Sequence, residues 1–253
     1  MKTENYEGKY YGVYRLSLKE ELICAAVGVG LSAVAAWILY RSCLGMLLGI
    51  IICPLYRNYY RKEQIEKQKK KLLQQFKDAM QSVSIALTSG YSMENAWKEA
   101  EKEIRELYGA GAYMEEELKQ MNRAIGVNQA VEQIFYQFAL RSECEDILSF
   151  AEVLRFAKRS GGNFREIIQK TVARICGKLE VEREIETVIA GKKMEQKIMN
   201  IVPVCLLAYL NLTASDFLQP LYGNLAGICV MTIAFAAYVG ALFLAKRIVD
   251  IKI

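Results

Sequence analysis

The sequence predicts an all-α protein: a cytoplasmic helical bundle flanked by transmembrane helices at both ends of the chain. No stretch shows the strict apolar–polar alternation or the β-branched runs that are typical of strands. Apolar residues instead recur at helical spacing through a polar, Lys/Glu-rich middle. Residues 22–40 and 222–245 contain no charged residue, and a run of about 20 apolar residues is long enough to cross a bilayer as a helix.

Composition argues against several kinds of active site. The 253 residues include no histidine, which removes the commonest general base and the commonest metal ligand. Five of the seven cysteines lie in or beside apolar segments, and no two have metal-ligand spacing, so we interpret them as small buried hydrophobic residues. The phosphate-binding pattern G-x-x-x-x-G-K-[ST] does not occur. We therefore expect no catalytic, cofactor or metal site.

Residues 1–21 are predicted to form a polar, tyrosine-rich cytoplasmic leader. A signal peptide is an alternative, because residues 33–35 (Ala-Val-Ala) resemble a cleavage site. Four glutamates in the leader and a second apolar segment directly after the first both count against it. We expect the leader to stay attached and inside the cell.

Residues 22–60 are predicted to hold the N-terminal transmembrane helices. Residues 22–40 form the first span, and residues 43–56 form a shorter apolar run that ends in an interfacial aromatic group at 58–60. We interpret the two runs as a hairpin whose tip, with Arg41, faces outward. A single long, tilted helix through Arg41 is the alternative.

A basic run follows the second apolar segment. Seven lysines and arginines fall within residues 57–71, and next to a span this pattern is typical of a cytoplasmic anchor to anionic lipid head groups. A nucleic-acid surface is the alternative. It is disfavoured because Glu63 and Glu66 interrupt the run and a predicted span lies beside it, so we expect membrane lipids and no nucleic acid as partners.

Residues 61–197 are predicted to form the cytoplasmic helical bundle. Its expected helices cover residues 72–87, 92–108, 114–121, 127–140 and 144–158, followed by a helix that Asn163 caps. Gly90 is expected to end the first of them, and Gly161 and Gly162 to separate the last two. These glycine turns are either interaction sites or backbone caps between packed helices, and the second interpretation is favoured.

The last helix of the bundle organises the chain. From Phe164 no proline occurs until Pro203, so one long helix is expected to begin in water and enter the membrane. Its apolar stripe comprises Phe164, Ile167, Ile168, Val172, Ile175 and Leu179.

Residues 198–245 are predicted to form two C-terminal spans, followed by a cytoplasmic tail, residues 246–253. Lysines and arginines lie before the first span, after the second, before the third and after the fourth, and Arg41 alone lies on the other side. This positive-inside pattern predicts a multi-pass protein of the cell membrane with both termini and the bundle in the cytoplasm.

Glu115, Glu116 and Glu117, with Glu99, Glu101 and Glu103 nearby, are predicted to form an acidic surface. It is either a solvated face or a docking surface for a basic partner. Acid–base catalysis or a divalent cation site is disfavoured, because nothing in the sequence indicates that these carboxylates are buried.

Two stretches carry a resemblance to a known family. Residues 76–97 and 150–168 each read as a helix, a glycine turn and a second helix. Both are similar to the type II secretion F domain of the TadB and TadC proteins of tight-adherence pili, which are related to the platform proteins of type II secretion and type IV pili. The similarity covers about residues 72–212 and one domain. The short second span and the tyrosine-rich leader depart from the family pattern.

The resemblance implies an integral membrane platform protein, not an enzyme. As partners it implies a cytoplasmic secretion ATPase, prepilin or pilin subunits and a second platform protein, in a homo- or hetero-oligomer. A membrane-anchored helical scaffold or signalling protein is the alternative. A membrane enzyme or transporter is disfavoured, because polar residues at bilayer depth are few: Asn200, Asn211 and Asp216 lie near segment ends.

Overall fold

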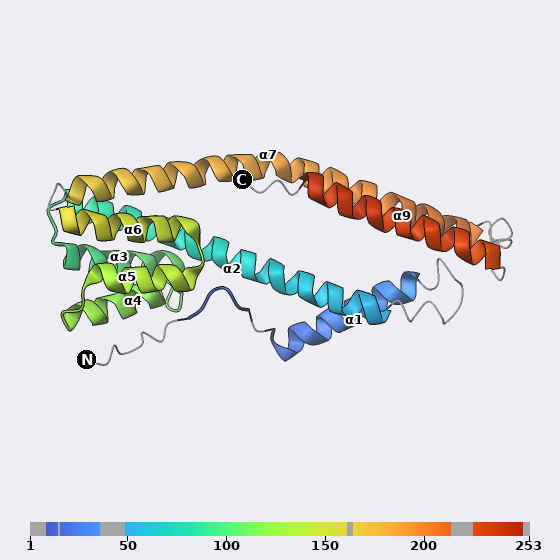
Figure 1. The fold of residues 1–253 in the computed structure, drawn as a ribbon, viewed down its shortest axis with the longest axis horizontal. Coiled ribbons are helices and arrows are strands. Elements are labelled where there is room, and N and C mark those ends of the chain that lie inside the picture. The colour runs from blue at the N-terminus through green and yellow to red at the C-terminus, as the bar shows by residue number, and fades with distance from the viewer. Residues whose placement is uncertain (1–8, 15, 36–48, 161–163, 214–224, 250–253) are drawn as a thin grey trace. The chain divides into compact units, whose positions relative to one another are not determined.

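The computed structural model describes residues 9–14, 16–35, 49–160, 164–213 and 225–249. In these ranges every regular element is an α-helix (Figure 1), which confirms the all-α prediction. The helices are α1 (Leu18–Ala35), α2 (Gly49–Thr88), α3 (Met93–Tyr108), α4 (Tyr113–Gly126), α5 (Val131–Ser142), α6 (Glu145–Ser160), α7 (Phe164–Thr213) and α9 (Leu225–Val249).

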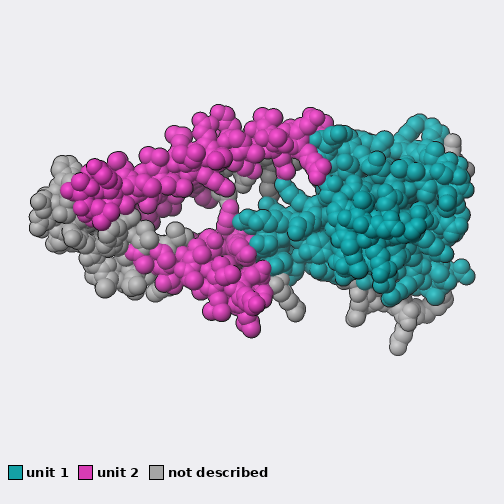
Figure 2. All heavy atoms as spheres, turned by 180° about the vertical axis from the view of Figure 1, so that it is seen from behind, with its two compact units in different colours: residues 1–15, 61–180 teal, residues 16–60, 181–253 magenta. Residues whose placement is uncertain are grey.

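The chain divides into two compact units (Figure 2). The first, called here the bundle unit, comprises residues 1–15 and 61–180. The second, called here the apolar unit, comprises residues 16–60 and 181–253. Helices α2 and α7 each contribute residues to both units.

The core of the bundle unit is built around aromatic rings. The ring centroid of Phe135 on α5 lies 5.5 Å from that of Trp97 on α3 and 5.2 Å from that of Phe150 on α6. Phe76 on α2 packs edge-on against Phe150, with ring centroids 5.7 Å apart. Tilted and edge-to-face pairs of this kind are favoured over stacked sandwiches, so one aromatic cluster ties together helices from four parts of the sequence.

Local signals set where the helices of the bundle begin and end. Helix α2 stops at Thr88, as predicted, and Gly90 follows it with a φ of 90°. The N–H of Gly90 donates to the carbonyl of Leu87, and the N–H of Tyr91 donates to that of Ala86, which is a Schellman motif. Ser92 then caps α3 by accepting from the N–H of Asn95 at 3.4 Å.

The predicted start of α5 at residue 127 is wrong. Helix α4 continues to Gly126, and Asn128 adopts a left-handed φ of 61°. The N–H of Gln129 donates to the carbonyl of Ala124, which closes a second Schellman motif. Asparagine tolerates this conformation better than most residues, and α5 therefore begins only at Val131.

The long helix predicted from Phe164 is confirmed. Helix α7 runs from Phe164 to Thr213 and includes Pro203 without a break. Three residues in its first turns belong to the buried core of the bundle unit: Ile168, Val172 and Ile175.

In the apolar unit, the described contacts pair α1 with α2 and α7 with α9. A Cβ on Gly28 of α1 would lie only 3.1 Å from Sγ of Cys53 on α2, so the two helices approach closely there. Arg57 of α2 forms an ion pair with Glu21 of α1 at 3.3 Å. The hydroxyl of Tyr238 on α9 donates to the carbonyl of Asn200 on α7.

Among the described residues, no helix combines the length and the hydropathy that a bilayer-crossing segment requires.

Several predicted features lie outside the described residues. Residues 36–48 include the end of the predicted first span, the hairpin tip at Arg41 and the start of the second apolar run. The same holds for Gly161, Gly162 and Asn163, and for the predicted loop at 214–224.

Candidate functional site

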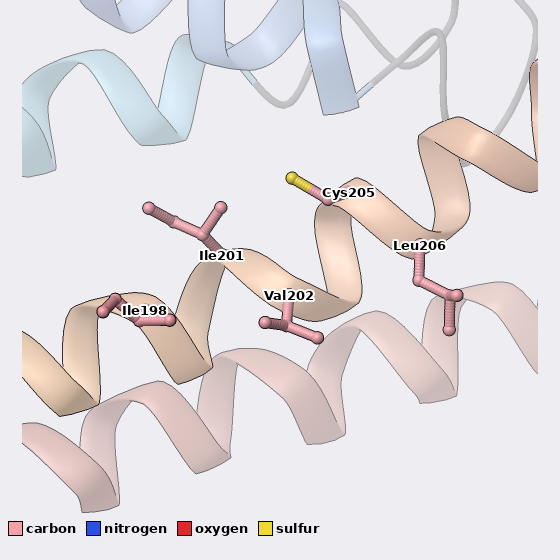
Figure 3. Close-up of a pocket in the computed structure, with 5 residues that line it drawn as sticks. All are labelled: Ile198, Ile201, Val202, Cys205 and Leu206. Carbon is pink, nitrogen blue, oxygen red and sulfur yellow. The ribbon is translucent and has the colours of Figure 1, made fainter.

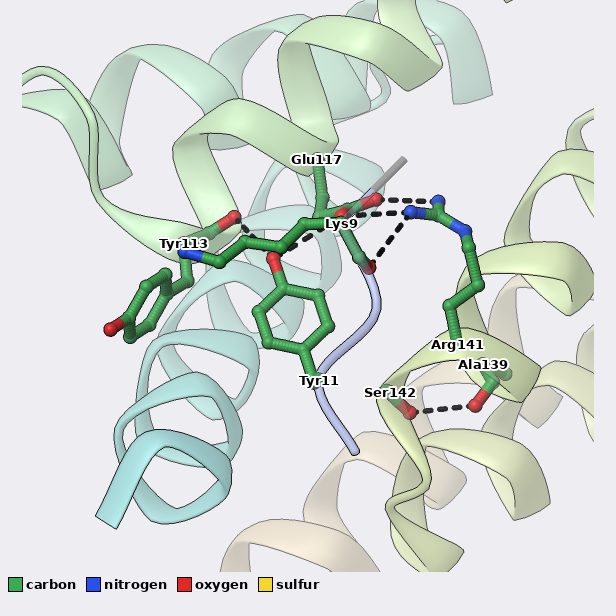
Figure 4. Close-up of polar contacts among 7 residues, drawn as sticks. All are labelled: Lys9, Tyr11, Tyr113, Glu117, Ala139, Arg141 and Ser142. Atoms are coloured by element: carbon green, nitrogen blue, oxygen red, sulfur yellow. Dashed lines mark hydrogen bonds and ion pairs between the residues drawn. The ribbon is translucent and has the colours of Figure 1, made fainter. Parts of the chain in front are cut away.

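The most specific polar cluster joins the N-terminal segment to helices α4 and α5 (Figure 4). Residues 9–12, called here the strap, lie against the bundle without forming a helix or strand. Tyr11 is fully buried (0% exposed) and belongs to the hydrophobic core. The predicted polar leader therefore contains a core residue, which periodicity did not reveal.

Tyr11 is held through its ring, its hydroxyl and its backbone. The ring packs edge-on against that of Tyr113 with centroids 5.8 Å apart. The hydroxyl donates to Oε1 of Glu117 at 3.2 Å and lies 3.5 Å from the backbone oxygen of Tyr113. The N–H of Tyr11 donates to the carbonyl of Arg141 at 3.0 Å. A buried tyrosine normally needs such a partner for its hydroxyl.

Glu117 on α4 and Arg141 on α5 form a buried two-pronged ion pair. Nη2 of Arg141 lies 2.8 Å from Oε2 of Glu117, and Nη1 lies 3.2 Å from Oε1. The side chain of Glu117 is 1% exposed and that of Arg141 is 14% exposed. Nη1 also donates to the backbone oxygen of Lys9 at 3.2 Å. The planar guanidinium matches a carboxylate in this way, and here it holds the strap as well.

The protonation of this cluster follows from its burial. Burial raises the pKa of the Glu117 carboxyl, while the hydrogen bonds from Arg141 and Tyr11 act in the opposite direction. Burial also raises the pKa of the Tyr11 hydroxyl, and the charge of Glu117 raises it further. Tyr11 therefore remains a neutral hydrogen-bond donor at physiological pH, so the cluster is suited to holding a segment in place.

A second, more exposed contact lies beside the first. Glu143, which follows α5 with a φ of 50°, forms an ion pair with Nζ of Lys69 at 2.8 Å and accepts a hydrogen bond from the hydroxyl of Tyr10. These two hydrogen bonds lower the pKa of Glu143. A Cβ on Gly12 would lie 2.2 Å from Oε1 of Glu143, so glycine allows the strap to pass close to this carboxylate.

The predicted acidic surface needs a correction. Glu115 and Glu117 are buried, at 3% and 1% exposure, and only Glu116 of the three is exposed. Glu117 shares the apolar stripe of Met114, Leu118 and Met121, and this helical spacing is the signal in the sequence that could have revealed its burial.

Three glutamates of this group have local contacts: Glu115, Glu101 and Glu99. Oε2 of Glu115 accepts from the N–H of Gly111 at 3.2 Å, just before α4 begins, where the helix dipole favours a negative charge. Glu101 accepts from Nδ2 of Asn122 at 2.6 Å. Oε1 of Glu99 lies 3.8 Å from Nζ of Lys102. Three lysine and arginine residues share α3 with the exposed glutamates: Lys98, Lys102 and Arg105. The surface is therefore of mixed charge.

Gly90 acts as a backbone cap, in agreement with the favoured interpretation of the glycine turns. A Cβ at Gly90 would meet nothing within 4 Å, so its positive φ, and not close packing, explains the glycine.

The apolar unit carries an open apolar groove of about 440 Å³ (Figure 3). Its lining residues all come from α7: Ile198, Ile201, Val202, Cys205 and Leu206.

The two cysteines of the bundle unit, Cys144 and Cys176, are half-buried. Burial raises the pKa of Cys144 to about 11 and also raises that of Cys176. Both thiols remain protonated at neutral pH, and the thiolate is the reactive form. The described residues contain no group of three or more Cys, Asp or Glu side chains arranged to hold a metal ion.

Comparisons of the chain with protein-family models, with curated proteins and with solved structures found no match.

Proposed function

We propose that this chain is an integral membrane platform protein of a type II secretion or tight-adherence pilus machine. In this proposal the bundle unit lies in the cytoplasm and binds a secretion ATPase, and the apolar unit lies in the cell membrane and handles pilin subunits. The chain itself catalyses no reaction, so the ATPase supplies the energy. The helix–glycine turn–helix stretches at 76–97 and 150–168, which resemble the type II secretion F domain, support this choice of machine.

One observation carries the proposal. Helix α7 is a single element whose first turns are core residues of the bundle unit and whose last turns expose apolar side chains. The exposed group comprises Ile198, Met199, Ile201, Val202, Leu206, Tyr209 and Leu212. An apolar surface of this extent on a soluble monomer marks a site that contacts protein or lipid. An unbroken helix between the two units can transmit a movement of one to the other.

Helix α9 supports a lipid environment for the apolar unit. It is apolar around its circumference and exposes Val230, Ile233, Val239, Phe243, Leu244 and Ile248. A helix that is apolar all round is typical of a membrane span or a deeply buried core. In this proposal the exposed apolar side chains of α9 contact lipid, and the charge pattern of the sequence places both termini in the cytoplasm.

A flexible insertion in α7 tests the coupling. Gly191 lies within α7, and a Cβ there would meet nothing within 4 Å. An eight-residue Gly/Ser insertion after Gly191 should abolish pilus assembly while the protein remains folded and bound to the ATPase. The same insertion at Gly111, in the exposed turn before α4, is the matched control and should allow assembly.

The outcomes separate the proposal from its alternative. Normal assembly with the insertion after Gly191 would contradict mechanical coupling through α7. Purification of the detergent-solubilised chain with neither an ATPase nor a prepilin would favour a membrane-anchored scaffold. A reporter fused to the C-terminus should be active only in the cytoplasm, and activity outside the membrane would contradict the proposed topology.

A further inference from the structure

Each residue of the strap makes a specific contact with the bundle. The carbonyl of Lys9 accepts from Arg141, and its Nζ lies 4.5 Å from the centre of the Tyr113 ring. The hydroxyl of Tyr10 donates to Glu143, and Gly12 passes directly beside the same carboxylate. The strap is thus held, as a bound peptide is, through both side chains and backbone groups.

The position of Tyr11 is selective for tyrosine. The ring fills a buried space beside Tyr113. At the end of this space the carboxylate of Glu117 accepts the hydrogen bond from the hydroxyl. Phenylalanine would fill the space but leave Glu117 with one donor fewer, and alanine would leave the space empty.

The next position, Gly12, lies close to the Glu143 carboxylate. A Cβ on Gly12 would lie 2.2 Å from Oε1 and 2.6 Å from Oε2 of Glu143. A larger residue would have to displace this carboxylate from its ion pair with Lys69. The site therefore recognises the ring and the hydroxyl of Tyr11, and the glycine that follows in the turn leaves the Glu143 carboxylate on Lys69.

We propose that helices α4 and α5, with Lys69 of α2, form a peptide-binding site for the sequence Lys-Tyr-Tyr-Gly, and that the strap is its ligand within the same chain and can be released. The strap belongs to no helix or strand, so it can leave without unwinding an element of the bundle. This inference does not depend on the proposed function, because every residue that carries it belongs to the bundle unit.

Release of the strap would change what holds the segment before α1. Helix α1 begins at Leu18, so five residues separate the strap from the start of this helix. The strap is covalently joined to the rest of the bundle unit through residues 16–60, so its rebinding is an intramolecular step with which an added peptide must compete. The strap thus acts as a latch on the segment that leads into α1.

A synthetic peptide tests the site in the full-length chain. A fluorescent peptide of residues 5–16 is titrated, by anisotropy, against the purified wild-type chain and the Tyr11→Ala variant. The strap fills the wild-type site, so the peptide should bind the variant at least about tenfold more tightly. The same peptide carrying Tyr11→Ala is the matched control and should bind neither chain. Circular dichroism of the variant reports whether its helices are retained.

A second variant guards against misfolding of Tyr11→Ala. Gly12→Val leaves Tyr11 in place and displaces the Glu143 carboxylate from Tyr10 and Lys69, so it should weaken the hold on the strap and also open the site to the peptide. Val13→Ala, at an exposed neighbouring position, should behave as wild type does. Equal peptide affinity for wild-type chain and both opened variants would overturn the proposal. A dimer that Tyr11→Ala abolishes would overturn the assignment to the same chain, because a second copy would then supply the strap.

Discussion

The two ends of helix α7 differ in their surroundings more than in their residues. Ile168 near its start is buried in the bundle unit, whereas Ile201 near its end is exposed. Both isoleucines lie in apolar stretches of one continuous helix. The comparison teaches that an apolar stripe specifies only that a face avoids water. Whether protein or another apolar medium covers that face depends on which elements pack against it.

The largest expected difference in the free energy of unfolding is between variants of two phenylalanines, one from each unit. Phe135→Ala removes the ring at the centre of the aromatic cluster and should destabilise the bundle by about 4 kcal/mol. Phe243→Ala, at an exposed site on α9, should change the free energy of unfolding by less than about 0.5 kcal/mol. Denaturant unfolding of the detergent-solubilised variants measures both. Comparable losses would show that α9 has a protein partner at Phe243.

Two isoleucines make the same comparison on one helix. Ile168→Ala should cost about 3 kcal/mol, because it leaves a cavity in the core. Ile201→Ala should be close to neutral, since Ile201 is 59% exposed. Thermal unfolding followed by circular dichroism reports the two values. A large effect at Ile201 would contradict the exposure of its side chain.

One ion pair from each unit allows the same comparison of stability. Arg141→Met leaves Glu117 buried without its partner and should cost about 2 kcal/mol, since Arg141 retains some exposure to solvent. Arg57→Met breaks an exposed pair with Glu21 and should cost less than about 0.5 kcal/mol. Unfolding in low and high salt distinguishes them further, because salt screens the exposed pair more strongly. Equal losses would contradict the burial of Glu117.

The smallest expected effect is the pH dependence of the contact at Glu143. Its pKa is lowered from an ordinary value of 4.5 by the hydrogen bonds from Lys69 and Tyr10. The contact therefore stabilises the fold above about pH 4.5 and is lost as the pH falls through the lowered pKa. Glu143→Gln should flatten this part of the stability profile measured between pH 3 and pH 6.

Glu195 of the apolar unit is the matched control for this pH effect. Its pKa is also lowered, by a hydrogen bond from Lys192 three residues earlier on α7. That contact joins neighbouring turns of one helix, whereas Glu143 joins the strap to α2 across long stretches of sequence. Glu195→Gln should therefore change the stability profile less than Glu143→Gln does. An equal change in both variants would show that the effect does not come from the strap.

Local sequence determined much of this fold. The helical spacing of apolar residues, the stop at Gly90, the cap at Ser92 and the unbroken run from Phe164 all appear in the structure where they were predicted. Each depends on interactions between residues within a few positions of one another, which a single sequence displays directly. The late start of α5 was missed because Asn128 competes with the helix for a local turn.

Only the tertiary structure decided the chemistry of the candidate site. Nothing in the leader distinguishes Tyr11 from its neighbouring tyrosines, and Glu117 resembles the glutamates beside it. Their burial depends on a contact between positions 106 residues apart and on Arg141 from a third segment. The sequence by itself thus determined where the helices lie and which faces avoid water. The packing of distant segments determined which polar groups are buried, because the desolvation of a charge is acceptable only where its partner is already in place.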